Sequence, residues 1–419
     1  MATSSPVARP QYHQQPLTET PPTAPRPSRL RRWSSWAMLG LAFCLTLELA
    51  CRVEDWVMYR MPLLSRFSTL NDLVVHDSTG WHGRPNAQFE KWRMNSFGIR
   101  GPETALQAAP GTFRVMTVGA SETFGLRETE NREYPRQLED SLNVVLARGQ
   151  CPNAPMRRFE VLNAAFAGMG LPTIDQDLRN RLWRLHPAII VVYANPEAYL
   201  DDDRPVAAPP DTSTQAAHRN AGHNLPLSRG LMPRAVGRVR EQLKQATPGF
   251  IRTFLRVRQT RAMLAQHPKG WRFDSIPADR IAAYEADLRV ALGTIRQVGA
   301  MPLLVTHGNE FMGRRDPDKE MLIAWEKFYP RATAPVIVAF DSLAREVTLR
   351  VGADSGVTTI DAARVLSAAP VSIFADFVHF TDAGSAVMAD VIRPGVLHAA
   401  GLASCVPTDA PNAASRDSR

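Results

Sequence analysis

The stretch Val115-Met-Thr-Val-Gly-Ala-Ser-Glu-Thr-Phe-Gly125 decides how the rest of the chain is interpreted. Its first half is an apolar run typical of a buried β-strand, and its second half is a turn of small residues with the hydroxyl of Ser121 at the end of the strand. In open parallel sheets, ligands bind at the carboxyl ends of the strands. The stretch therefore predicts a serine at a ligand-binding edge, either as a nucleophile or only as a cap of the next helix.

Strand patterns alternate with helix patterns along the following sequence. Residues 188–194, Ala-Ile-Ile-Val-Val-Tyr-Ala, are apolar without alternation, which indicates a strand covered on both faces. Further strand patterns lie at 114–119, 159–165, 301–307 and 357–361, and helix patterns at 134–148, 172–186, 277–298, 335–351 and 381–399. This alternation predicts an α/β fold, a three-layer α/β/α sandwich built on a parallel sheet.

Composition excludes several classes of protein. The chain has 419 residues, 44% apolar and 21% charged, so it can bury a large core and is not a disordered or fibrous protein. The formal net charge is +8, but the basic residues are spread along the chain and are not interleaved with aromatic residues. We therefore expect no nucleic acid as a partner.

The N-terminal region predicts a membrane anchor. Residues 1–28 are rich in Pro, Thr, Ser and Gln, a composition typical of disorder. Arg29, Arg31 and Arg32 then precede the apolar run Ala37–Leu47, which predicts that the N-terminus stays in the cytoplasm and that the rest is exported. A cleaved signal peptide, with Ala50-Cys51 near the cleavage site, is the alternative to a retained anchor.

The expected organisation has five parts. They are a disordered cytoplasmic leader (1–32), a transmembrane anchor with a juxtamembrane helix (33–60), a linker or N-terminal extension (61–110), the main domain (111–400) and a disordered tail (401–419). The main domain carries an insertion at 200–275 with a basic amphipathic stretch at 229–261. That stretch is expected to be a solvated helical insertion, or to serve at the membrane surface or as a substrate clamp. Cys151 and Cys405 are the only two cysteines that can pair outside the membrane segment.

A second candidate for chemistry lies near the C-terminal end. In Asp376-Phe-Val-His379 the carboxylate precedes the imidazole by three residues, just ahead of the helix pattern at 381–399. A serine hydroxyl becomes a useful nucleophile when an imidazole takes its proton, and a carboxylate fixes the tautomer of that imidazole. Ser121, His379 and Asp376 are therefore candidates for a catalytic triad. His307, after the fourth strand pattern, could line the pocket or replace His379 as base, although it has no Asp at a suitable spacing.

These motifs resemble those of the SGNH/GDSL hydrolases and acyltransferases, particularly the membrane-anchored bacterial envelope members. The resemblance covers about residues 95–400 and implies that Ser121 is the nucleophile, His379 the general base and Asp376 the carboxylate that orients it. The usual Asp before the nucleophile is Ala120 here. Residues 95–101 also resemble the segment that precedes the first motif, with a surface turn as the alternative.

Two middle motifs imply the oxyanion hole. Val161-Leu-Asn-Ala-Ala-Phe-Ala-Gly168 resembles the second motif, so Gly168 and Ser121 would donate backbone N–H groups. The third motif, Gly-x-Asn-Asp, is replaced by Ala194-Asn-Pro-Glu197, which leaves Asn195 as the candidate side-chain donor. The loss of one such donor typically lowers the rate roughly a hundred- to a thousandfold.

The resemblance implies a membrane-anchored serine esterase or O-acyltransferase without a metal or other cofactor. Its expected substrate is a small O-acyl ester, with acetyl on an envelope glycan preferred, and its expected partners are the inner membrane, through residues 33–60, and envelope polysaccharide machinery. The expected location is the bacterial inner membrane, single-pass, with the catalytic domain in the periplasm. A non-catalytic glycan-binding or scaffold subunit, and a lipase or thioesterase, are the alternatives.

Overall fold

The computed structural model describes residues 29–149, 151, 154–201, 232–314, 316–369 and 373–405. The chain divides into two compact units, Met1–Leu47 and Glu48–Arg419, and helix α1 (Arg29–Tyr59) runs through the boundary. Over Trp33–Tyr59 this helix is long and apolar enough to cross a membrane, and few of its residues are buried. It fits the expected anchor, although a signal sequence would satisfy the same criteria.

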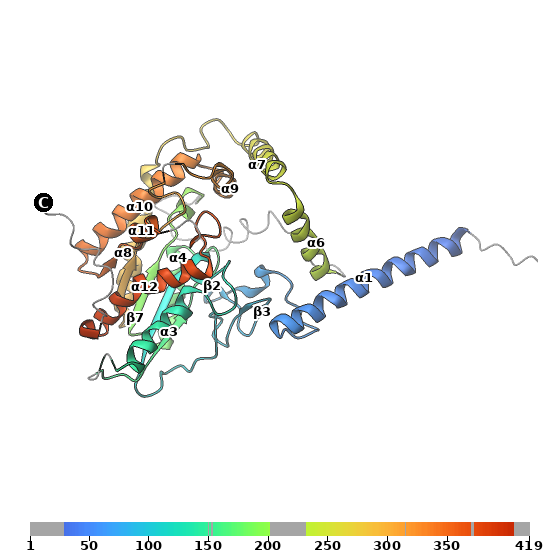
Figure 1. The fold of residues 1–419 in the computed structure, drawn as a ribbon. Coiled ribbons are helices and arrows are strands. Elements are labelled where there is room, and N and C mark those ends of the chain that lie inside the picture. The colour runs from blue at the N-terminus through green and yellow to red at the C-terminus, as the bar shows by residue number, and fades with distance from the viewer. Residues whose placement is uncertain are drawn as a thin grey trace, which may run out of the picture. The chain divides into compact units, whose positions relative to one another are not determined.

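A five-stranded parallel sheet forms the centre of the second unit (Figure 1). Its strands lie in the order β6-β5-β7-β8-β9, the 2-1-3-4-5 order of flavodoxin-like folds. The bounds of the strands are β5 (Thr112–Gly119), β6 (Arg158–Asn163), β7 (Ile189–Tyr193), β8 (Met301–Val305) and β9 (Thr359–Ile360). All five expected strands are present, and the predicted parallel sheet is confirmed.

Helices cover both faces of the sheet, as the apolar pattern predicts. Alternate residues of β7 point to opposite cores: Ile190 and Val192 contribute to one, and Ile189 and Val191 to the other. The first core also contains residues of α4 (Leu171–Asn180), α8 (Ala278–Gln297) and α10 (Ala334–Asp354). The second contains residues of α3 (Tyr134–Ala147), α11 (Ala362–Ser367) and α12 (Asp382–Ala399). The three-layer α/β/α sandwich is thus confirmed.

The segment 61–110, expected as a linker or extension, folds into short elements. They are η1 (Leu70–Leu73), the antiparallel pair β1 (Val74–Asp77) and β2 (Gly80–Gly83), and the antiparallel pair β3 (Gln88–Phe89) and β4 (Trp92–Arg93). Strands of two to four residues carry too little alternation to be recognised in a sequence. The backbone N–H of Arg100 donates to Asn163 O at 3.0 Å, so the end of this segment is fastened beside β6.

The insertion contributes two helices, α6 (Pro233–Ala246) and α7 (Gly249–Leu264). Helix α6 falls within the predicted basic amphipathic stretch, and α7 extends three residues beyond it. Pro248 separates the two helices because it favours an extended backbone in the residue that precedes it. Residues 202–231 lie outside the described residues. Helix α7 packs on α9 (Lys319–Phe328), a helix that the sequence analysis did not identify.

The remaining differences concern element ends. The helix pattern at 172–186 is interrupted, because α4 ends at Asn180 and a short η2 (Leu182–Leu185) follows. Cys151 and Cys405 form a disulfide with a Cα–Cα distance of 5.3 Å. Cys405 closes η6 (Ala403–Cys405) at the start of the expected tail, and residues 406–419 lie outside the described part of the chain. The expected leader also lies outside it up to residue 28.

Candidate active site

Ser121 begins the one-turn helix α2 (Ser121–Phe124) directly beyond the carboxyl end of β5. The turn requires the glycines on each side of it. A Cβ on Gly119 would overlap Thr123 and the carbonyl of Tyr193, and Gly125 ends the helix with φ of 82°, a left-handed conformation. These constraints hold the half-buried Ser121 just beyond the carboxyl end of β5, the position that the sequence predicts.

The segment 95–101 braces this turn and is not a simple surface turn. Arg100 is buried, and its guanidinium donates to the carbonyls of Phe124 and Gly125 and forms an ion pair with Glu133 at 3.0 Å. Asn163 at the end of β6 donates to Thr123 O at 2.9 Å. The C-terminal half of α2 is therefore fixed from two neighbouring elements.

His379 and Asp376 form a close pair in the loop before α12. Asp376 Oδ1 lies 2.7 Å from His379 Nδ1 and accepts the backbone N–H of His379 at 3.0 Å. The other ring nitrogen, His379 Nε2, is buried, and no described residue forms a hydrogen bond with this atom. Burial alone would lower the pKa of His379, but the hydrogen bond and charge of Asp376, together with the charge of Glu122, raise it above its ordinary value. This arrangement suits an imidazole that accepts a proton at Nε2.

Asp376 has a second partner, the half-exposed Arg127, whose Nε donates to Oδ2 at 3.0 Å. Burial would raise the pKa of Asp376, but the hydrogen bond and charge of His379, with the charge of Arg127, lower it well below its usual range. Asp376 is therefore ionised throughout neutral pH, as a carboxylate that orients an imidazolium must be.

Residues just beyond α2 bring the two ends of the chain together. Thr129 donates from its backbone N–H and its hydroxyl to Asp382, at 2.7 and 2.6 Å. Ser385 donates to Glu128 Oε1 at 2.6 Å. With the Arg127–Asp376 ion pair, these contacts dock the start of α12 against the loop that follows Ser121. Sequence reasoning missed them, because each depends on a partner about 250 positions away along the chain.

Glu122 is an unexpected member of the site. Its side chain is buried, and Ser121 Oγ lies 3.4 Å from its Oε2, the hydrogen bond that the described structure records for that hydroxyl. Among the described residues, Ser121 and His379 form no hydrogen bond with each other. Burial would raise the pKa of Glu122, but the close approach and charge of His307 and the charge of His379 lower it. Glu122 is therefore an ionised carboxylate beside both the serine and two imidazoles.

The candidate oxyanion donors flank Ser121, because β5 lies between β6 and β7. Gly168 is exposed in the loop after β6 with φ of 89°, and no acceptor for its N–H is recorded among the described residues. Asn195 follows β7, but its Nδ2 donates to Glu122 Oε1 at 3.1 Å and to the Tyr329 hydroxyl at 3.3 Å. Gly168 is thus available as a donor, whereas Asn195 would have to break existing hydrogen bonds.

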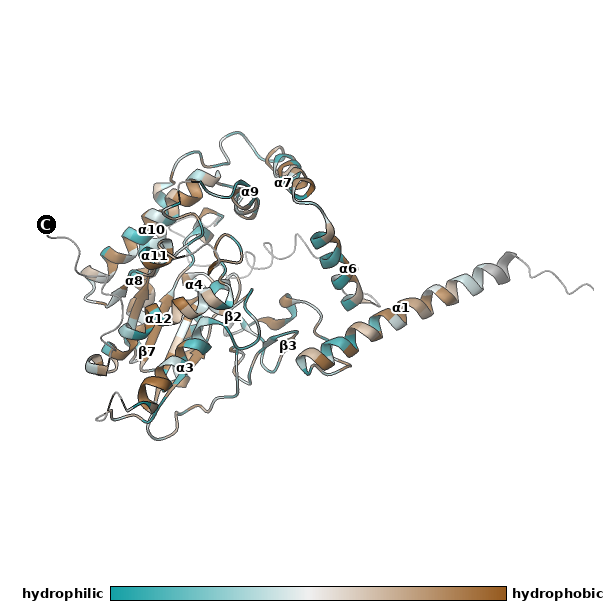
Figure 2. Ribbon diagram, viewed as in Figure 1, coloured by the Kyte–Doolittle hydropathy of each residue, from teal (hydrophilic) through white to brown (hydrophobic). Residues whose placement is uncertain are grey.

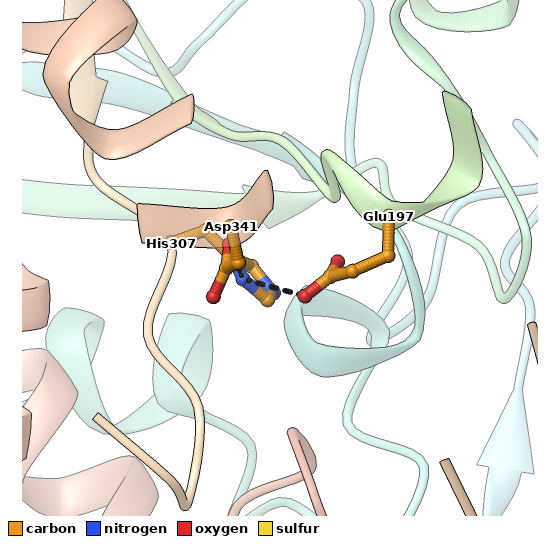
Figure 3. Close-up of side chains that lie close together, drawn as sticks. All are labelled: Glu197, His307 and Asp341. Atoms are coloured by element: carbon orange, nitrogen blue, oxygen red, sulfur yellow. Dashed lines mark hydrogen bonds and ion pairs between the residues drawn. The ribbon is translucent and has the colours of Figure 1, made fainter. Parts of the chain in front are cut away.

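His307 belongs to a second buried group with Asp341 and Glu197 (Figure 3). Its Nδ1 lies 2.9 Å from Asp341 Oδ1 and 3.5 Å from Glu197 Oε1, and its Nε2 lies 3.7 Å from Glu122 Oε1. No Asp lies at a suitable spacing in the sequence near His307, but the fold supplies one from α10, since Asp341 is 34 positions away along the chain. Neither oxygen of Glu197 has a hydrogen-bond partner among the described residues.

The second group contains an excess of carboxylates. Burial would lower the pKa of His307, but Glu197 and Asp341 raise it well above its ordinary value; burial also raises the pKa of Glu197 well above its own. A proton on Glu197 is therefore favoured. Donor atoms of Glu197, His307 and Asp341 all lie within 4.8 Å of one another, so these are the described residues that could hold a metal cation.

The comparisons with known proteins concern the fold. Neither a protein-family model nor a curated protein matches the sequence. The structure is similar to LAE5, an α/β hydrolase enzyme from the metagenome of Lake Arreo, Spain, with 15% identity over 70% of this chain and 96% of that chain (TM-score 0.37). It is similar to a lipase/acylhydrolase from Enterococcus faecalis, with 14% identity over 68% and 95% (TM-score 0.38). It is also similar to Axe2, an acetylxylan esterase from Geobacillus stearothermophilus, with 11% identity over 70% and 96% (TM-score 0.38). At these values the similarity does not establish a family.

Proposed function

We propose that the protein is a membrane-anchored serine esterase or O-acyltransferase of the SGNH type. The observation that carries this proposal is the His379–Asp376 pair, joined at 2.7 Å through Nδ1 and docked by Arg127 and Thr129 beside the turn that presents Ser121. A buried Nε2 without a hydrogen-bond partner among the described residues is the atom that a serine proton requires.

In the proposed cycle, Ser121 Oγ attacks an ester carbonyl while its proton moves to His379 Nε2. Asp376 stabilises the imidazolium, and the N–H groups of Ser121 and Gly168 stabilise the oxyanion. The imidazolium then protonates the departing alcohol, which leaves an acyl group on Ser121. Water releases the acid in an esterase, and a sugar hydroxyl accepts the acyl group in a transferase. Asn195 contributes as a third donor only if its amide leaves Glu122.

The proposed substrate is a small O-acyl ester, with acetyl groups of envelope glycans preferred. Support for an exported, single-pass protein of the bacterial inner membrane comes from α1, which is long and apolar enough to span a bilayer, and from the Cys151–Cys405 disulfide, a bond that persists in oxidising compartments such as the periplasm. The basic residues ahead of the span favour an N-terminus in the cytoplasm.

One observation favours a second candidate, a non-catalytic glycan-binding subunit. In the described structure the Ser121 hydroxyl lies against the carboxylate of Glu122 and is not hydrogen-bonded to His379. A site that binds glycans without turnover would have no need for that hydrogen bond. The two candidates differ in whether the serine is activated.

The test is covalent labelling of the full chain with a fluorophosphonate, followed by peptide mapping. We expect labelling at Ser121, no labelling of Ser121→Ala, and strongly reduced labelling of His379→Ala, since the imidazole must accept the proton. Ser342→Ala, on the exposed side of α10, is the matched control and should label like the parent. Folded protein that never labels would favour the binding subunit. Hydrolysis rates across p-nitrophenyl esters of increasing chain length then separate an acetyl esterase from a lipase.

A further inference from the structure

Helix α7 exposes large apolar side chains on the side that faces away from α9. The side that contacts α9 carries Arg252 and Arg256, which form ion pairs with Glu320 at 3.5 and 3.4 Å. The opposite side carries Phe250 and Phe254, which are 75% and 64% exposed. A helix normally buries its apolar stripe against the domain. An outward-facing stripe with two phenylalanines indicates a surface that contacts an apolar phase.

Helix α6 carries a second exposed apolar stripe. Val236, Val239 and Leu243 are exposed, and their spacing of three and four residues places them on one side of the helix. Exposed basic residues accompany both stripes, and they include Lys244 on α6 and Arg258 and Arg261 on α7. Apolar side chains flanked by Lys and Arg are typical of helices that lie in a membrane interface. Figure 2 shows the alternation of hydrophilic and hydrophobic residues along α6 and α7.

Ion pairs fix the start of α6 to the part of α1 that follows the apolar run. Arg234 is buried and pairs with Asp55, and Arg238 pairs with Asp55 at 3.0 Å. The first N–H groups of α6, from Arg234 and Ala235, both donate to Glu48 Oε2 at 3.1 Å. Glu48 directly follows the apolar run that ends at Leu47. The N-terminus of α6 is therefore held against the C-terminal part of α1, between Glu48 and Asp55.

We propose that α6 and α7 form a platform that binds the surface of the anionic phospholipid bilayer in which α1 is anchored. The proposal rests on the anchor in the proposed function and extends it. Because α6 is held to the part of α1 that follows the apolar run, the proposed anchor would bring α6 close to the bilayer surface. The exposed Lys and Arg side chains of both helices favour anionic headgroups. The exposed side chains of Phe250, Phe254 and Leu243 would enter the boundary between headgroups and acyl chains.

The test measures amide hydrogen exchange of the full chain in nanodiscs of phosphatidylcholine alone or with phosphatidylglycerol. Peptides from Gly249–Leu264 should exchange more slowly in the discs that contain phosphatidylglycerol, by about fivefold for each basic residue that contacts the surface. The double variant Phe250→Asp with Phe254→Asp should lose this protection. The matched control, Val144→Asp with Val290→Asp on α3 and α8, replaces exposed apolar residues elsewhere and should retain it.

Size-exclusion chromatography reports separately whether the chain enters the discs. A chain that stays out contradicts the anchor, and the platform with it. A chain that enters but shows equal exchange of α7 in both kinds of disc overturns the platform alone. Protection that persists in the Phe250→Asp, Phe254→Asp variant also overturns it, because another surface would then be responsible. The proposed activity at Ser121 is tested separately, by fluorophosphonate labelling, and does not depend on the outcome of the exchange experiment.

Discussion

Two histidines in this protein make the same contact in different surroundings. His379 and His307 each contact an aspartate through Nδ1, at 2.7 Å to Asp376 and 2.9 Å to Asp341, and each has a buried Nε2 without a hydrogen-bond partner among the described residues. Both histidines lower the pKa of Glu122. What differs is the rest of each environment. Asp376 is partly exposed and paired with Arg127, whereas Asp341 is fully buried beside a further carboxylate, Glu197.

The difference shows how two similar pairs can serve different ends. At the first pair, the hydrogen bond and charge of His379, followed by the charge of Arg127, lower the pKa of Asp376, so this carboxylate would remain ionised during the proposed proton transfer. Around the second pair, burial opposes the charged forms, and the main nearby charges that set the pKa of Glu197 and His307 are those of these two residues, Asp341 and Glu122. A proton on Glu197 would therefore reduce the excess of negative charge around His307 and Asp341. We therefore assign proton transfer to the first pair and a structural role to the second.

The largest expected effect is on catalysis. Asp376→Asn should lower kcat for a small acyl ester on the order of 10⁴-fold, because an amide cannot stabilise the correct tautomer and the imidazolium. The matched variant, Asp341→Asn, makes the same change at the second pair and should cost much less. Steady-state rates with an acetyl ester provide the measurement. Equal losses in the two variants would contradict the assignment of roles, and a larger loss in Asp341→Asn would make His307 the better candidate for the base.

The His379–Asp376 pair could be predicted from the sequence, whereas the His307–Asp341 pair could not. Asp376 and His379 are three residues apart in one loop, so local geometry alone brings them together. His307 follows β8 and Asp341 lies in α10, and only the packing of α10 on the sheet makes them neighbours. Ser121 could likewise be predicted from a strand pattern and a small-residue turn. The role of Glu122 could not, since it depends on where His307 and Asn195 lie.

The fold followed the same rule. Long apolar strands and helices with clear periodicity were predicted close to their observed bounds, including β7 and α3. The two antiparallel strand pairs in the segment 61–110 were not, because each strand is too short to show a period. The ion pairs between α6 and α1 were also missed, since they join positions about 180 residues apart.

The second prediction concerns stability. Asp341→Ala should lower the free energy of unfolding by about 3–5 kcal/mol, because it leaves the His307 imidazolium buried without its hydrogen-bonded partner. Glu197→Gln is the matched control in the same group. Its amide resembles a protonated carboxyl, so it should leave the free energy unchanged or increase it. Chemical denaturation followed by circular dichroism measures both variants. A Glu197→Gln variant as unstable as Asp341→Ala would show that Glu197 is ionised and needed as a charge.

The smallest expected effect is a shift in the pH dependence of kcat/KM when Arg127, the residue that distinguishes the first pair from the second, is replaced. As the proposed base, His379 must be neutral, and its pKa lies above the ordinary 6.5, so kcat/KM should rise with pH through a midpoint above that value. Arg127 lowers the pKa of His379, and Arg127→Gln should therefore move the midpoint to higher pH. Because Arg127 is half exposed and screened, the shift should be only about 0.1–0.7 pH units.

A pH profile of kcat/KM at low and high salt tests this shift, since salt should move the parent profile in the same direction as the substitution. Glu128 requires a control. Burial raises the pKa of its carboxyl to about 7, although the Ser385 hydroxyl opposes this, so it titrates in the same window. Glu128→Gln should leave the acid limb in place if His379 is the base, and should remove it if the limb belongs to Glu128. A midpoint that moves to lower pH in Arg127→Gln would mean that Arg127 acts mainly by holding Asp376 ionised, because a weaker carboxylate charge stabilises the imidazolium less.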